Sequence, residues 1–241
     1  MPTPMMNLEN YVSSLEARGD LKPLPISEDE MCERYEQLFT SAVNDVLRED
    51  GLLRQTLSNE ILPLREHMKV CGPVFTIRSA PSMEVSMEME SRAEMLEAIT
   101  PGSVVVWDTA KENFAAHWGE MMTKTTKKHG CRGAIVDGGV RDTDRVLQQD
   151  FPLFCRYRNS NGMLGRTRIN AYQVPVTIDG VEIFPGDFAF GDIDGCIIIP
   201  RDRAYDVLLR AEAIQRNEED ISLWIDDGVT PTEIVERGGY F

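Results

Sequence analysis

An arginine and an aspartate stand side by side at positions 141 and 142, directly after the apolar stretch GAIVDGGV. The guanidinium of Arg141 can bind a carboxylate through two parallel hydrogen bonds. The carboxylate of Asp142 can hold a hard cation such as Mg²⁺, which keeps several waters and lets a substrate complete its shell. Gly138 and Gly139 leave room for a ligand beside the backbone. The pair therefore indicates a site for a metal ion and a carboxylate ligand.

The same pair also has a purely structural interpretation. Asp142 could N-cap a short helix over TDRVLQQD, residues 143–150, with Arg141 as a surface charge. The spacing alone favours this second interpretation. Asp137 is expected to be a turn residue at the end of its strand.

A second candidate segment is HWGEMMTK, residues 117–124. Gly119 stands where a loop is expected to enter a helix, and the N-terminus of a helix can receive a carboxylate. Glu120 would then stand at the mouth of the site, where it could hold a metal-bound water. The alternative is an exposed first-turn glutamate favoured by the helix dipole. We expect His117 and Trp118 to be packing residues.

Other familiar catalytic and binding motifs are missing from the sequence. It has no G-x-G-x-x-G, no Walker loop, no H-x-x-x-H pair and no G-x-S-x-G elbow. Asp192 and Asp194 lack the spacing of a calcium loop, and a turn between strands explains them better. Glu218 and Glu219 fit most simply on a solvated helix face.

Composition narrows the class of protein. The chain has 241 residues, of which 42% are hydrophobic and 27% charged, as in one large globular domain. Its formal net charge of -15 argues against nucleic acid and anionic membranes as partners, but not against anionic small molecules. Five cysteines without a C-x-x-C pair indicate a reducing compartment. We expect a cytoplasmic protein without a signal peptide or a membrane span.

The pattern of apolar residues predicts helices first, an α/β core next and mostly strands after residue 170. A helix over residues 7–19 precedes one that begins at a Ser27–Glu30 capping box, breaks near Thr40 and ends at Gly51. In the core, strands are expected at 70–80, 103–109, 133–139 and 151–157, and helices at 93–100, 117–130 and 143–150. Later strands are separated by turns at 179–180, 185–186 and 194–195, and a last helix covers about 201–226. This order of elements indicates an α/β fold.

Several of these segments resemble, in order and spacing, the RraA-like family. That family includes class II pyruvate aldolases acting on 4-hydroxy-4-methyl-2-oxoglutarate and 4-carboxy-4-hydroxy-2-oxoadipate. The resemblance covers about residues 38–226, and its most specific feature is WGE about twenty residues before DGGVRD. It is carried by TSAVNDVL, CGPVFTIR, AITPGSVVVWD, WGEMM, GAIVDGGVRD, FPLFCR and VPVTIDGVEIFPGDFAFGDIDGCIIIP.

The resemblance implies a swivelling β/β/α fold. An N-terminal helical extension over 1–30 would precede an RraA-like α/β domain over 31–226, followed by a C-terminal tail over 227–241. Assembly as a homotrimer or homohexamer is implied, with the sites at subunit interfaces.

The resemblance also implies roles for individual residues. Asp142 would bind the divalent metal, Mg²⁺ or Mn²⁺, and Arg141 the carboxylate of the pyruvyl unit. Glu120 would position a metal-bound water. Glu218, from a neighbouring subunit, is the expected acid that completes the water shell. Backbone groups would bind the same pyruvyl unit at Gly119, Glu120, Met121 and Met122.

The expected function is metal-dependent cleavage of a 4-hydroxy-2-oxo acid to pyruvate and a second oxo acid. Oxaloacetate decarboxylation is the expected side activity, because it also leaves pyruvate enolate. One alternative is a non-catalytic regulator that binds ribonuclease E, as some proteins resembling this chain do, since an acidic surface suits a basic partner. Another is a different lyase or hydrolase, in which TAKENFAAH reshapes the pocket through Lys111, Asn113 and His117.

Overall fold

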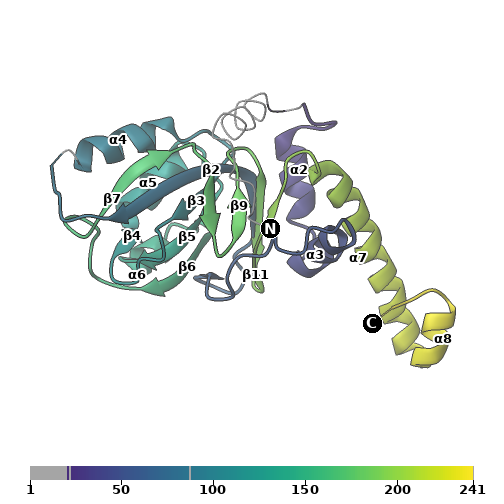
Figure 1. Ribbon diagram of the computed structural model, residues 1–241. Coiled ribbons are helices and arrows are strands. Elements are labelled where there is room, and N and C mark those ends of the chain that lie inside the picture. The colour runs from purple at the N-terminus through teal and green to yellow at the C-terminus, as the bar shows by residue number, and fades with distance from the viewer. Residues whose placement is uncertain (1–20, 22, 87, 241) are drawn as a thin grey trace, which may run out of the picture.

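A curled mixed sheet forms the centre of the molecule, and helices pack against its outer side (Figure 1). The structure, a computed structural model, describes residue 21 and residues 23–86 and 88–240. The helix expected over residues 7–19 lies outside these residues. The predicted α/β class is confirmed.

The described elements are these. The strands are β1 (Leu62–Pro63), β2 (Val70–Pro81), β3 (Val104–Asp108), β4 (Ala116–Trp118), β5 (Gly133–Val140), β6 (Leu153–Arg158), β7 (Thr167–Tyr172), β8 (Val176–Ile178), β9 (Val181–Ile183), β10 (Phe188–Asp192) and β11 (Gly195–Ile199). The helices are α2 (Glu28–Tyr35), α3 (Thr40–Glu49), α4 (Glu88–Ala98), α5 (Glu120–Lys128), α6 (Thr143–Leu147), α7 (Ala204–Asp226) and α8 (Pro231–Glu236).

The order of strands determines where the site can lie. The sheet runs β1-β6-β5-β3-β2-β10-β11, with β4 added to β5 and β7 to β2. Strands β2, β3, β5 and β6 are parallel, so their carboxyl ends meet at one edge. The segments that follow β3, β5 and β6 therefore come together there. Ligands of α/β sheets commonly bind at this edge.

Side chains along each buried strand alternate between the two faces of the sheet and pack into a separate core on each face. On the outer side, Val105 and Trp107 of β3 belong to a core shared with α4 and α5. On the inner side, Val104 and Val106 pack with the β8–β9 hairpin, which closes the curl. Burying each such side chain contributes roughly 1.5–3 kcal/mol. The sheet edge is thus held by packing on both faces.

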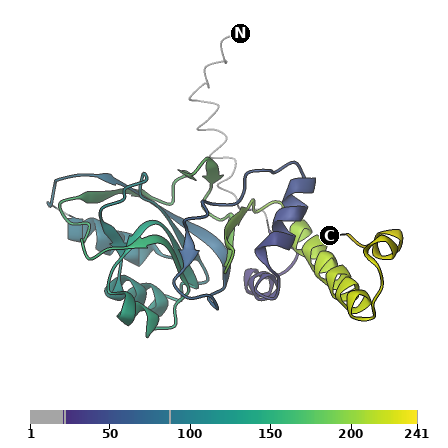
Figure 2. The ribbon, with the colours of Figure 1, turned by 90° about the horizontal axis from the view of Figure 1, so that it is seen from below.

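A second helical layer covers the β10–β11 end of the sheet (Figure 2). Helices α2, α3 and α7 meet there, and the Tyr35 hydroxyl donates to the carbonyl of Ala204 at 2.6 Å. Helix α7 continues away from the sheet and carries α8 at its far end. Thr230 and Glu233 form a capping box at the start of α8, and Ile234 is buried. No helix was predicted in this tail.

The predicted bounds of several helices and strands can be compared with those in the structure. The break near Thr40 is confirmed, since α2 ends at Tyr35 and α3 begins at Thr40. The helix expected over residues 117–130 starts only at Glu120, because Ala116–Trp118 pair with β5 as β4 and Gly119 is the N-cap. Strand β7, which pairs with β2, was not predicted. The division of the chain at residues 30 and 226 stays a prediction.

Two general expectations concern cysteines and membranes. All five cysteines are free thiols and buried, at positions 32, 71, 131, 155 and 196. Within the described residues, no helix is both long and apolar enough to span a bilayer.

Candidate functional site

Arg141 and Asp142 follow β5 at the carboxyl edge of the parallel strands and open into a cleft of about 360 Å³. Their side chains are 47% and 43% exposed, and Arg141 Nε lies 3.6 Å from Asp142 Oδ2. The cleft is formed by the ends of β5 and β6 together with the residues that follow them. Its lining residues are Val140, Arg141, Asp142, Thr143, Arg158, Asn159 and Ser160.

The backbone of Asp142 argues against a helix-capping role. Its φ of 53° and ψ of 34° are left-handed, a conformation that non-glycine residues adopt uncommonly. Its side chain makes no capping hydrogen bond to α6. Asp142 therefore occupies the N-cap position of α6, as the structural interpretation supposed, but its carboxylate does not cap the helix. Strained backbone of this kind clusters at functional sites.

The start of α5 packs directly against this pair. The Arg141 N–H donates to the carbonyl of Trp118 at 2.9 Å. A Cβ atom added to Gly119 would lie 2.9 Å from Asp142 Oδ2 and 3.1 Å from Arg141 Cγ. Only glycine leaves both side chains where they are. The two segments singled out in the sequence thus meet at one place.

The first turn of α5 offers backbone donors rather than side chains. The first intrahelical bond runs from Thr123 N–H to the carbonyl of Gly119, 3.0 Å. The N–H groups of residues 120–122 precede that bond and have no acceptor within the helix. The Met121 side chain is exposed, whereas that of Met122 is buried in the outer core. Any role of Met122 in binding must therefore use its backbone.

Glu120 is turned toward the neighbouring helix. Its Oε2 accepts a hydrogen bond from Arg145 of α6 at 3.0 Å. Its carbonyl accepts another from the side chain of Gln149 at 3.3 Å. The first contact ties the start of α5 to α6, and the second ties it to the residues that directly follow α6. Glu120 thus lies close to Arg141 and Asp142, but its carboxylate already forms an ion pair with Arg145.

The loop after β6 closes one side of the cleft. The Ala116 N–H donates to the carbonyl of Asn161 at 2.6 Å, and Asn159 Nδ2 donates to that of Phe114 at 2.9 Å. A Cβ atom on Gly162 would lie 2.8 Å from Arg141 Nη1. The guanidinium therefore rests against this loop. The contribution of this loop was not predicted from the sequence. The one signal for it was that the loop follows the strand expected over residues 151–157.

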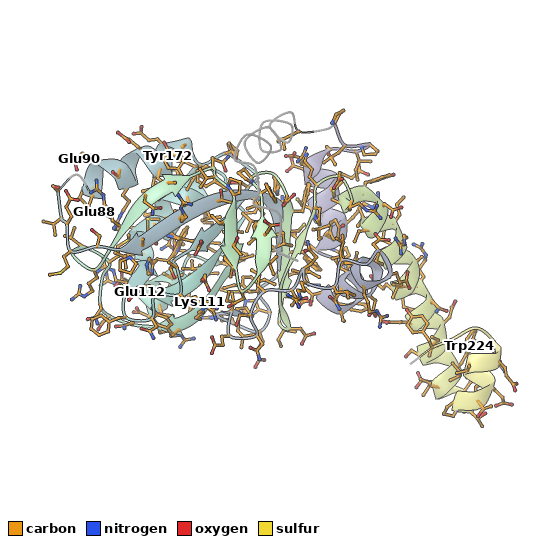
Figure 3. The ribbon with its side chains drawn as sticks, viewed as in Figure 1. Glu88, Glu90, Lys111, Glu112, Tyr172 and Trp224 are labelled. Atoms are coloured by element: carbon orange, nitrogen blue, oxygen red, sulfur yellow. The ribbon has the colours of Figure 1, made fainter. Side chains whose placement is uncertain are left out.

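The residues suspected of reshaping the pocket do not line this cleft. Lys111 and Asn113 line a separate cleft of about 660 Å³ with Arg156 and Asp179 (Figure 3 labels Lys111). His117 is only 2% exposed, and its ring meets that of Trp107 edge-on.

The interior position of His117 affects its titration. Burial lowers the pKa of His117 to about 4, with a smaller contribution from the positive charge of Arg92. The ring is therefore neutral at pH 7. A neutral imidazole packed between Trp107 and Gly138 is a packing residue, as expected.

The expectation that Asp137 is a turn residue is wrong. The residue lies inside β5, fully buried, and pairs with the guanidinium of Arg156 from β6. Burial raises the pKa of Asp137 to about 6, and the charge of Arg156 opposes that rise. Arg156 also binds Asp179 and Glu60. This network links β6, the β8–β9 turn and the segment before β1.

Two acidic positions lie elsewhere. Asp192 accepts hydrogen bonds from the N–H and hydroxyl of Thr40 at 2.7 and 2.8 Å, at the end of β10 before the turn to β11. The turn interpretation of Asp192 and Asp194 is confirmed. Glu218 lies on α7, which leads away from the sheet toward Trp224 (Figure 3). Partial burial and Asp45 raise the pKa of Glu218. Its role toward a neighbouring subunit stays a prediction.

The donor set in the cleft limits the metals that could bind. Among the described residues, no cluster of three or more His, Cys, Asp or Glu side chains could hold a metal ion. Asp142 is the one carboxylate among the described residues that line the cleft. Zinc, which takes three or four protein ligands, fits poorly. Magnesium, which keeps several waters and takes one or two carboxylates, fits well.

The curled α/β sheet with an open cleft at its carboxyl edge defines an α/β protein of the kind that binds small ligands beyond the ends of its parallel strands. A family model described as "RraA-like: Aldolase/RraA" matches residues 40–198. The chain belongs to the RraA-like family.

Relatives with names support this membership. Protein DlpA of Legionella pneumophila is 32% identical over 88% of this chain, which spans only 35% of DlpA. A Halalkalibacterium halodurans protein named "Putative 4-hydroxy-4-methyl-2-oxoglutarate aldolase" is 32% identical over 81% of this chain and 89% of its own length.

Solved structures share the fold. Streptomyces coelicolor RraAS2, described as an unusual member of the RNase ES inhibitor RraA family, has a TM-score of 0.74 and 28% identity, over 84% of this chain and 99% of its own. A structure described as "novel cellulases from microbes associated with the gut ecosystem" has a TM-score of 0.85 and 48% identity, over 90% of this chain and 97% of its own.

Proposed function

We propose that this chain is a divalent-metal-dependent aldolase that cleaves a 4-hydroxy-2-oxo acid to pyruvate and a second oxo acid. The observation that carries the proposal is that the start of α5 packs against Arg141 and Asp142, which line one cleft. The name of the H. halodurans relative points the same way. Oxaloacetate decarboxylase activity would accompany the cleavage.

The residues of the cleft suit the two ends of a pyruvyl group. Arg141 supplies a planar fork for its carboxylate. The backbone N–H groups at the start of α5 supply further donors, and the helix dipole favours negative charge there. Asp142 would hold the metal, whose chemistry when bound is to polarise the 2-oxo group and offset charge on the adjacent oxygens.

The cleavage itself moves one proton and one electron pair. The C4 hydroxyl gives up its proton, its oxygen forms the carbonyl of the second product, and the C3–C4 bond breaks. The electron pair of that bond passes into the pyruvate enolate, which Arg141 stabilises. Protonation at C3 then gives pyruvate. Glu120 is our candidate to help remove the hydroxyl proton, through a water, once its contact with Arg145 loosens.

Asp142→Asn tests the assignment. The purified protein should release pyruvate from 4-hydroxy-4-methyl-2-oxoglutarate with Mg²⁺ or Mn²⁺ and stop when EDTA is added. Asp142→Asn should lower kcat/KM by at least about 100-fold, because the amide loses the charge that holds the cation. A coupled lactate dehydrogenase assay measures pyruvate. Normal metal-dependent turnover by Asp142→Asn would show that the metal lies elsewhere.

Regulation of a ribonuclease is the second candidate, favoured by the likeness to RraAS2 and by the net charge of -15. A regulator would bind a basic partner without needing the carboxylate of Asp142. Pull-down of a ribonuclease E-type enzyme, together with no pyruvate release from any 4-hydroxy-2-oxo acid, would favour it. Cellulose hydrolysis is poorly supported, since glycosidases generally use two carboxylates and Asp142 is the one carboxylate among the described lining residues.

A further inference from the structure

Arg158 lines the same cleft as Arg141, and the aldolase proposal gives it no role. We propose that Arg158 binds the second carboxylate of a dianionic substrate and selects dicarboxylic over monocarboxylic 4-hydroxy-2-oxo acids. This inference rests on the proposed function, because it assumes that Arg141 takes the first carboxylate. It assigns the distal half of the substrate to β6 and the loop after it.

Strand pairing places the two arginines beside each other. Val140 of β5 is the register partner of Arg158 of β6, and Arg141 follows Val140 directly. Neighbouring strands lie about 4.8 Å apart. The two side chains therefore leave adjacent strand ends into one cleft of about 360 Å³. A short acid with a carboxylate at each end has a partner for both groups there.

The guanidinium of Arg158 is weakly engaged. The hydrogen bond recorded for it, from Nη2 to the carbonyl of Leu64, is 3.5 Å long, at the limit of such contacts. The neighbouring Arg156 instead binds Asp137, Asp179 and Glu60. An arginine has five donors, so Arg158 keeps most of them for a ligand.

The charge balance of the cleft favours a dianion. Its described lining residues include two arginines and one carboxylate, that of Asp142, in a protein with a net charge of -15. A metal ion on Asp142 would make the cleft more positive still. A monocarboxylate would leave the Arg158 guanidinium without an anion. A second carboxylate would complete the pairing.

Substrate discrimination by Arg158 is measurable with a matched pair of substrates. 4-Hydroxy-4-methyl-2-oxoglutarate carries the distal carboxylate, and 4-hydroxy-4-methyl-2-oxopentanoate has a methyl group in its place. Arg158→Met should lower kcat/KM for the first by about 10- to 100-fold, the range for losing a charged hydrogen bond. It should change the second by less than about threefold. Arg158→Lys, which keeps the charge but loses the fork, should fall between.

A binding measurement provides a readout independent of turnover. 2-Oxoglutarate lacks the C4 hydroxyl, so it cannot undergo the cleavage, yet it carries both carboxylates. By calorimetry with Mg²⁺, wild-type protein should bind 2-oxoglutarate at least about 10-fold more tightly than 2-oxopentanoate, and Arg158→Met should remove that preference. Arg48→Met, which changes an exposed arginine on α3, is the matched control and should retain it.

The outcomes separate this inference from the aldolase proposal. Pyruvate release by wild-type protein, with Arg158→Met losing both substrates equally or neither, would overturn the role of Arg158 and leave the aldolase intact. No pyruvate release, with an Arg158-dependent preference for 2-oxoglutarate, would overturn the aldolase and support the dicarboxylate site. Thermal unfolding of Arg158→Met at the wild-type temperature would exclude misfolding as the cause of any loss.

Discussion

Replacing Gly119 with alanine should damage the site without damaging the fold. The added Cβ would stand 2.9 Å from Asp142 Oδ2 and 3.1 Å from Arg141 Cγ, whereas ordinary contacts begin at 3.4 Å. The Asp142 carboxylate must therefore withdraw by at least about 0.5 Å, and Arg141 by a few tenths of an ångström. Both side chains are about half exposed, so they can move into solvent. The backbone of Gly119 is extended, at φ -171°, which alanine adopts readily.

The consequence should appear in catalysis rather than stability. A misplacement of about 1 Å can cost about 100-fold in rate, so shifts of this size in both groups should lower kcat/KM for pyruvate release by about 10- to 100-fold. The Mg²⁺ concentration for half activity should rise, because the displaced carboxylate is the expected ligand. The free energy of unfolding should change by less than about 1 kcal/mol.

The assays are steady-state pyruvate release, a Mg²⁺ titration and urea unfolding. Lys124→Ala, one turn further along the exposed face of α5, is the control and should match wild type in all three. A stable Gly119→Ala protein with wild-type kcat/KM and wild-type Mg²⁺ dependence would refute the geometry. Loss of the fold would refute the claim that the clash is confined to side-chain ends.

Two further predictions concern buried charges. The pKa of His117 is about 4 in the fold against 6.5 in the unfolded chain, so the unfolded chain binds more protons in this window. Stability should fall by about 3 kcal/mol as the pH drops from 6.5 to 4, and His117→Leu should abolish that component in urea titrations at several pH values. Arg156→Met should lower the free energy of unfolding at pH 7 by about 3 kcal/mol or more, because it strands the buried Asp137 carboxylate. Adding Asp137→Asn should restore part of the loss, and no restoration would contradict this account.

The sequence was sufficient for the parts of the site that local patterns encode. Buried apolar runs predicted β3 and β5, although the turn expected at Gly138 and Gly139 is wrong, because β5 continues through both glycines to Val140. Gly119 was placed where a loop enters a helix, and α5 does begin directly after it, at Glu120. These signals depend on neighbours within a few residues. That is why they could be read without the fold.

What the sequence could not predict depends on register. Arg158 enters the cleft because β6 lies parallel to β5 with Val140 opposite it. Asp137 seemed to end a strand because its partner, Arg156, is nineteen residues away and joins it only when β5 and β6 pair. The left-handed backbone of Asp142 lies in the two-residue connection between β5 and α6. Each is a tertiary constraint that no local propensity encodes.

The protein as a whole is strongly negative, whereas the described residues that line the cleft include two arginines and one carboxylate, and this difference in charge determines how an anionic ligand would be bound. At a net charge of -15, the field of the protein repels an approaching dianion at long range. Salt at physiological strength screens that repulsion beyond about 8 Å, whereas contacts inside the cleft are screened less. Affinity for an anionic substrate must then come from short-range pairing with Arg141, Arg158 and a cation on Asp142. Because only these few groups supply the affinity, the loss of any one of them should weaken substrate binding strongly. The loss of one charge from a broad basic surface would weaken binding much less.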